Sequence, residues 1–343
     1  MQIEIRNIHE SYAFDLFDYL IFVGSNQVGK QRIFSLIDRY FASASYNEVE
    51  EEYFGDNGIE ICIEGKKIRV NSCLFMSLSN VDDLLLQFKL TKKSLLYSSL
   101  CDLGQDIEVS QQMMHVNDEL LKLEAMIGHK QSSVLGNIGY LISDLTFEDI
   151  IGKLMTTSYK KNNREIPSYL LDGEDMIDGF LKLVEQYMSI TGKQVWISIN
   201  NPENFLSVEG THRLIEGLKN LARISKQLYF FVFHQRNNTL YDVEDIHHTV
   251  VCASDIQQLP DFETFLQSVE RNYPGNYQFD SEELAESFYR ICSEIGVNKS
   301  LKYPSMTRDV VLLKVICELF EEDIQFETSN NDISFLEQTY LLS

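Results

Sequence analysis

Strand-length apolar runs occur near the start of the chain and again after its middle. In Ile59-Glu60-Ile61 apolar and polar residues alternate, whereas residues 228–233 are almost continuously apolar. Alternation is typical of a half-buried strand, and a continuous short run is typical of a fully buried one. The pattern predicts strands at 2–6, 19–23, 59–63, 67–70, 73–78, 194–199, 228–233 and 248–252.

Helical spacing separates several of these strands. It predicts helices at 30–40, 174–189 and 208–224, and Gly192 is the expected stop of the second. Buried strands that alternate with helices are typical of a mostly parallel sheet covered on both faces. We therefore expect an α/β core.

Two stretches depart from this alternation. Between 80 and 164 the strand signals stop, and a stripe of Leu120, Leu121, Leu123 and Met126 indicates helices that pack on one another or on another protomer. After 255, Asp280 with Glu283 predicts a helix start, and further helices are expected near 306–320 and 333–342. The predicted organisation is a head of 1–79 and 165–254, a helical insertion of 80–164 and a C-terminal helical extension of 255–343. The acidic run 48–52 is interpreted as a solvated loop.

Composition narrows the class of protein. A hydrophobic fraction of 44% and only 5 Pro in 343 residues indicate a folded chain. No apolar run approaches the roughly 20 residues that span a bilayer, so we expect a cytoplasmic protein with no membrane partner. The six Cys are scattered without a C-x-x-C pair, which favours buried thiols over zinc ligands. A net charge of −23 argues against broad nucleic-acid affinity, although an oligomer can gather its cations on one surface.

A phosphate-binding motif is partly present between the strand 19–23 and the helix 30–40. Residues 24–31 are Gly-Ser-Asn-Gln-Val-Gly-Lys-Gln, so Gly24, Gly29 and Lys30 have P-loop spacing. The last position of a working P-loop is Ser or Thr, whose hydroxyl binds Mg²⁺, but here it is Gln31. This predicts a degenerate P-loop that has lost its metal ligand.

Three further positions fit the same interpretation. The strand 194–199 ends in Asn200 and Asn201, where an ABC or SMC ATPase head has Asp and Glu, and an amide neither balances a metal charge nor acts as a base. Asp172 precedes a helix where such heads have a signature loop, and His234 follows a strand where they have a switch histidine. The predicted fold is an α/β, ABC/SMC-head-like domain without hydrolysis. The alternatives are a helix N-cap at Asp172, a structural His234 and a fortuitous Gly-rich turn.

With these motifs, the chain resembles the large form of the CRISPR-associated Csn-two family, the adaptation protein of subtype II-A loci. The resemblance rests on residues 24–31, the helical insertion, the strand end at 196–201 and the added C-terminal helices, and it spans the whole chain. It implies a non-enzymatic protein that binds double-stranded DNA ends, forms a ring-shaped homotetramer and binds Ca²⁺. It also implies a role in spacer acquisition with the integrase and effector nuclease of the same locus.

Two sets of residues are candidates for these implied ligands. DNA phosphates are bound by cations, and the predicted DNA-facing residues are Lys153, Lys160, Lys161 and Arg164, with Lys89, Lys92 and Lys93 as a second group. Calcium is bound by oxygens, and the predicted ligands are Asp144, Glu148 and Asp149, with Asp118 and Glu119 as weaker candidates. Asp144 and Glu148 are four residues apart and would share one helical face. A solvated basic face and an acidic, capped first turn of a helix are the alternatives.

Two other functions stay open from sequence. Lys30 and the glycines are compatible with a residual nucleotide-binding ATPase. The apolar stripes and the acidity fit a protein–protein adaptor built on an inactive ATPase scaffold.

Overall fold

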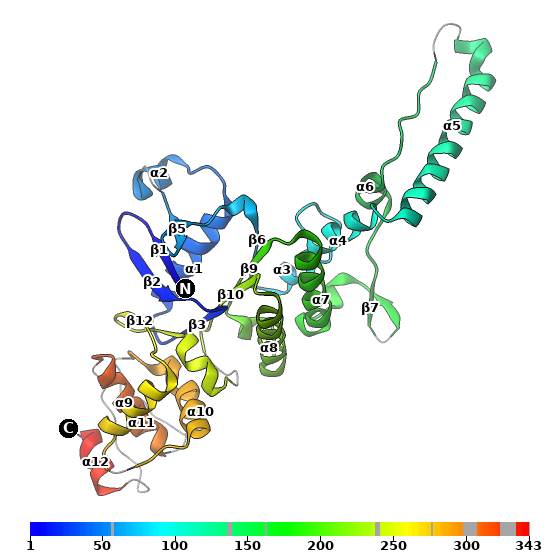
Figure 1. The fold of residues 1–343 in the computed structure, drawn as a ribbon. Helices are drawn as coiled ribbons and strands as arrows, with labels where there is room; N and C mark the ends of the chain where they lie inside the picture. The colour runs from blue at the N-terminus through cyan, green and yellow to red at the C-terminus, as the bar shows by residue number, and fades with distance from the viewer. Residues whose placement is uncertain are drawn as a thin grey trace. The chain divides into compact units, whose positions relative to one another are not determined.

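The computed structural model describes residues 1–55, 58–135, 139–161, 163–236, 241–275, 277–297, 307–322 and 334–342. The chain forms two compact units, one of Met1–Val81 with Lys193–Ser343 and one of Asp82–Gly192 (Figure 1). The unit boundary at Gly192 differs from the predicted end of the insertion at 164, because the helix before Gly192 packs on a helix of the insertion. The C-terminal extension belongs to the first unit.

A six-stranded sheet forms the centre of the first unit. Its strand order is β12 (Ile256–Gln258), β11 (Thr249–Cys252), β3 (Tyr19–Val23), β10 (Leu228–Phe233), β9 (Gln194–Asn200) and β6 (Cys73–Leu78). All neighbours pair in parallel except the edge strand β12. Every residue of β3 and β11 is buried, as the continuous apolar runs predicted. The α/β core is therefore confirmed.

A second, antiparallel sheet covers one side of helix α1 (Gln27–Ala42). Its order is β2 (Ser11–Asp15), β1 (Gln2–Arg6), β4 (Glu60–Ile63) and β5 (Lys66–Lys67). One hydrophobic core includes Ile3 of this sheet, Ile37 of α1 and Trp196 of the central sheet. Helix α1 is thus packed between two sheets, which fixes the loop that precedes it.

The first unit also contains α8 (Val208–Ser225) and a helical C-terminal part. The latter contains α9 (Phe262–Asn272), α10 (Ser281–Ile291), α11 (Thr307–Leu319) and α12 (Phe335–Leu342), and α11 contacts the other three. Asp280 caps α10 by accepting hydrogen bonds from the backbone N–H groups of Glu282 and Glu283. The helices predicted near 306–320 and 333–342 are confirmed, although residues 306 and 333 lie outside the described part of the chain.

The second unit is mostly helical. It contains α3 (Val81–Leu86), which starts at the boundary, α4 (Leu95–Leu103), α5 (Ile107–Leu135), α6 (Phe147–Asp149), a π-helical turn (Ile150–Leu154) and α7 (Gly173–Thr191). Figure 1 shows α5 as the longest helix, with the returning chain beside it. Asn117 donates to the carbonyl of Leu145 and accepts from its N–H, at 3.1 and 2.9 Å, so the return is bonded to the helix. Helix α7 ends at Gly192 in the left-handed region, as predicted.

The second unit also contains a strand pair that the sequence pattern missed. Residues Tyr159–Lys161 (β7) and Arg164–Ile166 (β8) form an antiparallel hairpin, so the prediction of helix to 164 is wrong there. Asn163 has φ +61° in the turn, a conformation that Asn tolerates better than most residues. Polar strands of three residues give no periodic signal.

Two local predictions in the first unit are also wrong. The acidic run forms helix α2 (Glu48–Phe54), because Asn47 and Glu50 make a reciprocal capping box and the acidic residues lie in the first turn. The strand predicted to 70 ends at Lys67, because Val70–Ser72 makes a 3₁₀ turn in which the Ser72 hydroxyl donates to the Arg69 carbonyl at 2.6 Å.

Within the part of the chain that is described, all six cysteines are free thiols, and four of them are buried. No helix there is both long enough and apolar enough to cross a bilayer.

Candidate functional site

The loop between β3 and α1 is shorter than the motif predicts. Helix α1 begins at Gln27, so only Gly24, Ser25 and Asn26 are outside regular structure. Asn26 caps the helix by accepting from the N–H of Gly29 at 2.8 Å. The amides of residues 28–30, which would face phosphates in a working P-loop, therefore belong to the first turn of a capped helix.

The other amides of this loop are bonded to distant parts of the chain. The Ser25 N–H donates to the Ile295 carbonyl at 3.1 Å, and the Asn26 N–H donates to the Cys252 carbonyl at 3.0 Å. Gly24 has φ +99°, and a Cβ there would lie 2.3 Å from the Cys252 oxygen. Two backbone donors of this loop are therefore occupied by carbonyls of distant segments, and we describe the loop as closed.

The side chain of Lys30 is buried beneath this closed loop. Its side chain is 3% exposed, and Nζ donates to the carbonyls of Gly24 at 2.6 Å and His234 at 2.5 Å. Burial lowers the pKa of Lys30. The ammonium is thus bound by main-chain oxygens of its own fold, in the place where a P-loop lysine would bind phosphate.

Amide side chains occupy the positions at which a working ATPase site would hold Mg²⁺. The side-chain amide nitrogen of Asn200 lies 3.4 Å from the amide oxygen of Gln31, so the two positions that would hold Mg²⁺ contact each other instead. Asn201 follows with φ +50°, and its N–H donates to the Phe233 carbonyl at 2.8 Å. The structure thus brings Gln31 and Asn200, the two positions singled out from the sequence, to one place.

Glu203 is a residue of this site that the sequence did not single out. Its carboxylate accepts from the N–H groups of Gln235 and Arg236 at 2.5 and 2.8 Å and from Nδ1 of His234 at 3.3 Å. Burial raises the pKa of Glu203, but these hydrogen bonds outweigh it, and the net pKa is lowered. In the neutral ring, Nε2 of His234 then accepts from the Tyr241 hydroxyl at 2.5 Å. His234 is 2% exposed and holds strand ends together, which is the structural alternative that the sequence left open.

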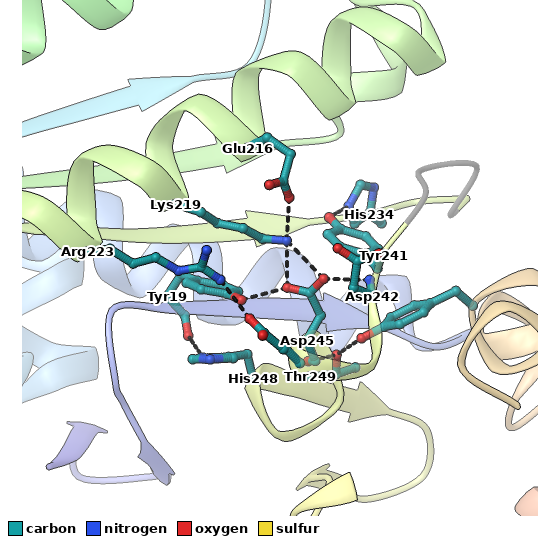
Figure 2. A network of polar contacts seen from close by, with 12 residues as sticks. Tyr19, Glu216, Lys219, Arg223, His234, Tyr241, Asp242, Asp245, His248 and Thr249 are labelled. Carbon is teal, nitrogen blue, oxygen red and sulfur yellow. Dashed lines mark hydrogen bonds and ion pairs between the residues drawn. The ribbon is translucent and has the colours of Figure 1, made fainter. Parts of the chain in front are cut away.

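A buried ion pair lies beside this group (Figure 2). Lys219 is 3% exposed and Asp245 is 1% exposed, and Nζ lies 2.7 Å from Oδ1. Asp245 also accepts from the Tyr19 hydroxyl at 2.6 Å and from the Asp242 N–H at 2.8 Å. The sequence feature that could have revealed Lys219 is its position on the apolar side of α8, next to Leu218 and one turn after Ile215. Lys219 Nζ also lies 2.7 Å from the partly exposed Glu216, so Asp245 supplies its buried counterion and the network ties α8 to the central sheet.

Asp172, at the predicted signature position, is the N-cap of α7. It accepts from the Asp175 N–H at 2.9 Å in a reciprocal capping box. The N-cap alternative is confirmed.

Two of the four predicted DNA-facing cations are paired with acids. Lys153 is 2.8 Å from Asp149, and Lys161 is 2.6 Å from Asp175 and 3.1 Å from Asp172. Lys160 and Arg164 are exposed, and neither has a carboxylate partner among the described residues. These two therefore offer the freer charge of the set.

The hairpin register divides these cations between two faces. Lys161 is opposite Arg164, and Lys160 is opposite Glu165. Residues directly opposite each other in an antiparallel pair share a face. Lys161 and Arg164 thus lie on one face, and Lys160 lies on the other face with Glu165, so only the first face carries two cations. The second predicted group, Lys89, Lys92 and Lys93, is exposed in the connection between α3 and α4.

The three predicted calcium ligands are not arranged as one site. Helix α6 begins at Phe147 with Thr146 as its cap, so Asp144 lies in the extended segment before it. The prediction that Asp144 and Glu148 share a helical face is therefore wrong. Asp149 accepts from the Thr146 hydroxyl at 2.6 Å and pairs with Lys153, which lowers its pKa.

Within the described ranges, no cluster of three or more acidic, His or Cys side chains is placed to hold a metal ion. The weaker candidates Asp118 and Glu119 are exposed on α5, and Glu119 pairs with Lys122 at 2.7 Å. The carboxylates Asp144, Glu148 and Asp149, as arranged here, do not fit Ca²⁺, which needs six to eight oxygens.

Comparison with known families covers nearly the whole chain. The family model described as CRISPR-associated protein Csn2 subfamily St matches residues 10–341. The chain belongs to this family. Csn2 membership makes it a CRISPR-associated protein and supports a role in CRISPR adaptation and defence, and it confirms the resemblance drawn from residues 24–31 and the added helices. No curated protein sequence matches the chain at a significant level.

A solved structure agrees with this fold. The crystal structure of Stu0660 of Streptococcus thermophilus matches with a TM-score of 0.85 at 19% identity, over 99% of this chain and 100% of that one. At this identity the likeness shows the fold alone. The structure of cbiO1 from Clostridium perfringens, part of the ABC transporter complex cbiONQ, matches with a TM-score of 0.35 at 10% identity, over 79% of this chain and 95% of that one. A score this low does not show a shared fold.

Proposed function

We propose that this Csn2-family chain is a non-catalytic protein that binds the ends of double-stranded DNA during CRISPR spacer acquisition. It acts as a homotetrameric ring, together with the integrase and effector nuclease of its locus. Its core is an ABC-like head kept as a scaffold, with residues 80–164 as the insertion and 255–343 as the extension. Family membership carries the proposal, and the closed loop at Lys30 supports its non-catalytic part.

The arrangement at the loop argues against phosphoryl transfer. The loop donors are bonded to Ile295 and Cys252, Lys30 is bonded to two carbonyls, and Gln31 contacts Asn200. Nucleotide binding would have to break these contacts before gaining any of its own. A residual ATPase is therefore the weaker alternative.

DNA binding draws support from the hairpin of the second unit. Lys160 and Arg164 are exposed cations without carboxylate partners among the described residues, and such groups bind phosphates without sequence preference. Lys153 and Lys161 already have acidic partners and would have to exchange them for phosphates.

Self-association draws support from α5. The helix buries none of its described side chains within the chain, and Ile107, Met114 and Leu121 are 74, 68 and 52% exposed at intervals of seven residues. An exposed heptad stripe of this kind is the pattern through which helices pair. A second copy of the chain is the partner that the ring requires.

The test is a gel-shift titration of linear against closed circular duplex DNA of the same sequence, with and without Ca²⁺, over a range of salt. Binding of the linear form alone supports loading at ends. A shift that persists in chelator would show that binding is independent of Ca²⁺, which agrees with described carboxylates that do not form a calcium site.

The variant Lys160→Ala/Arg164→Ala should weaken binding and reduce the slope of log affinity against log salt by about 2. The control Lys122→Ala/Lys182→Ala removes the same charge from α5 and α7 and should leave that slope unchanged. Absence of a shift for every DNA form would instead favour the protein–protein adaptor, whose mark is a stable complex with partner proteins.

A further inference from the structure

A hollow of about 990 Å³ opens at the edge of the antiparallel sheet in the first unit. One wall is the end of α1 with the chain after it, and the other is β5 with the 3₁₀ turn at Val70–Ser72. Glu64 and Gly65 have φ +48° and +72°, as a tight hairpin turn requires, and they bring Lys66 to the rim. The Tyr40 hydroxyl donates to the Ile68 carbonyl and joins the two walls.

The charge of this hollow is opposite to that of the chain. Its lining includes Arg39, Lys66, Lys67 and Arg69 and no Asp or Glu, whereas the whole chain has 52 acidic and 29 basic residues. The other lining side chains are apolar or neutral. A concave surface with one sign of charge concentrates ligands of the opposite sign.

Two of these cations are available to a ligand. Arg39 is held by Glu50, at 2.7 Å from Nε, and Lys67 lies 3.4 Å from Glu60. Lys66 and Arg69 are exposed, and no described carboxylate pairs with either. A ligand in the hollow would therefore meet two unpaired cations, with Arg39 and Lys67 already paired beside them.

Apolar surface lies beneath the charges. Tyr46, Ile59 and Val70 line the hollow, and the Arg39 guanidinium lies 4.6 Å from the centre of the Tyr46 ring. Cations that follow an apolar and aromatic floor are what proteins use to hold a nucleic-acid backbone without reading its sequence. An acidic peptide satisfies the charge but has no repeating phosphates to meet cations spread along a strand and a turn.

We infer that this hollow is a docking site for the sugar-phosphate backbone of DNA, in which Lys66 and Arg69 bind phosphate. The site is separate from the cations predicted from sequence, which all lie in the second unit. This inference rests on the proposed DNA binding and extends it to the first unit. Lysines at a sheet edge also discourage strand pairing between molecules, and a purely protective role is the structural alternative.

The experiment is fluorescence anisotropy of labelled linear duplex DNA with the full chain and with Lys66→Ala/Arg69→Ala. The variant should bind roughly tenfold more weakly at about 0.1 M salt, and the salt slope should fall by about 2. Both side chains are exposed, so its unfolding temperature should match that of the unmodified protein. The control Arg223→Ala/Arg271→Ala removes two exposed arginines of the same unit outside the hollow and should bind normally.

The outcomes separate the two proposals. If the unmodified chain binds and the hollow variant binds equally well, the docking site is wrong while the proposed function stands, and increased self-association of that variant would identify the protective role. If the unmodified chain binds no DNA, both proposals fail. If an oligoglutamate peptide binds in a manner that requires Lys66 and Arg69 while DNA binding does not, the hollow is a protein-docking site.

Discussion

The β3–α1 loop and the β7–β8 hairpin use their lysines in opposite ways. Lys30 is 3% exposed and donates to two main-chain carbonyls, whereas Lys160 is exposed without a described acidic partner. From sequence the loop was the stronger functional signal, because its spacing matches a known motif. The structure reverses that order, since a cation whose donors are already satisfied has little left to offer a ligand.

Spacing and availability are therefore separate properties. Spacing shows which residues a fold brings together, while availability depends on acceptors that come from distant parts of the chain, such as the Ile295 carbonyl at Ser25. A binding residue has to combine exposure with an unmet charge. The comparison predicts that a substitution of a buried polar group with partners inside the chain lowers stability. A substitution of an exposed cation without an acidic partner should instead weaken binding.

The largest effect should come from a substitution of Asp245, which lies in the buried polar network. Asp245→Asn keeps the shape but removes the buried counterion of Lys219, which is left with only the partly exposed Glu216. We expect a loss of about 3 to 5 kcal/mol in the free energy of unfolding, measured by urea denaturation. The matched control is Glu244→Gln, which breaks the ion pair between Arg223 and Glu244. Glu244 is 75% exposed, so this variant should lose at most about 1 kcal/mol of the free energy of unfolding. If both variants lose a similar free energy of unfolding, Asp245 contributes no more to stability than an exposed carboxylate does.

A smaller, pH-dependent effect should come from His248. Its Nδ1 donates to the Tyr19 carbonyl at 3.0 Å, and burial, assisted by the neighbouring His247, lowers its pKa to about 4. The unfolded chain has a pKa near 6.5 for this group, so it takes up the proton first as pH falls. The stabilisation is complete above about pH 6.5 and is lost progressively down to pH 4, by about 3 kcal/mol in total.

Unfolding free energies of the native chain and of His248→Asn, measured from pH 7.5 to pH 4, test this. The variant keeps an N–H donor but has no imidazole to protonate, so the two curves should converge as pH falls. Parallel curves would show that His248 is accessible to protons in the folded state.

The smallest expected effect is the change in thermal stability when nucleotide is added. A ligand at one hundred times its Kd adds about 2.7 kcal/mol to stability. Because the loop is closed, ATP with Mg²⁺ should shift the thermal unfolding temperature by less than about 1 °C. A larger shift that Lys30→Met abolishes would show that the loop opens, and it would restore the nucleotide-binding alternative.

The sequence predicted the central sheet well, because fully buried strands such as Tyr19–Val23 and Leu228–Phe233 carry continuous apolar runs. It missed the β7–β8 hairpin and helix α2, since short polar elements depend on a cap or a turn residue such as Asn47 or Asn163. It also missed Glu203, whose role comes from partners on another strand end. Contacts between residues far apart in the sequence leave no periodic trace.

The bond between Ser25 and Ile295 also has a consequence for how the chain folds. The two residues are separated by 270 positions (295 minus 25), so the loop is completed by a segment that is synthesised much later. At 5 to 20 residues per second, the Ser25 amide waits roughly 15 to 50 seconds for its acceptor. During that interval the Ser25 N–H lacks the Ile295 carbonyl that it bonds in the folded chain, so this bond is a late step in completing the loop.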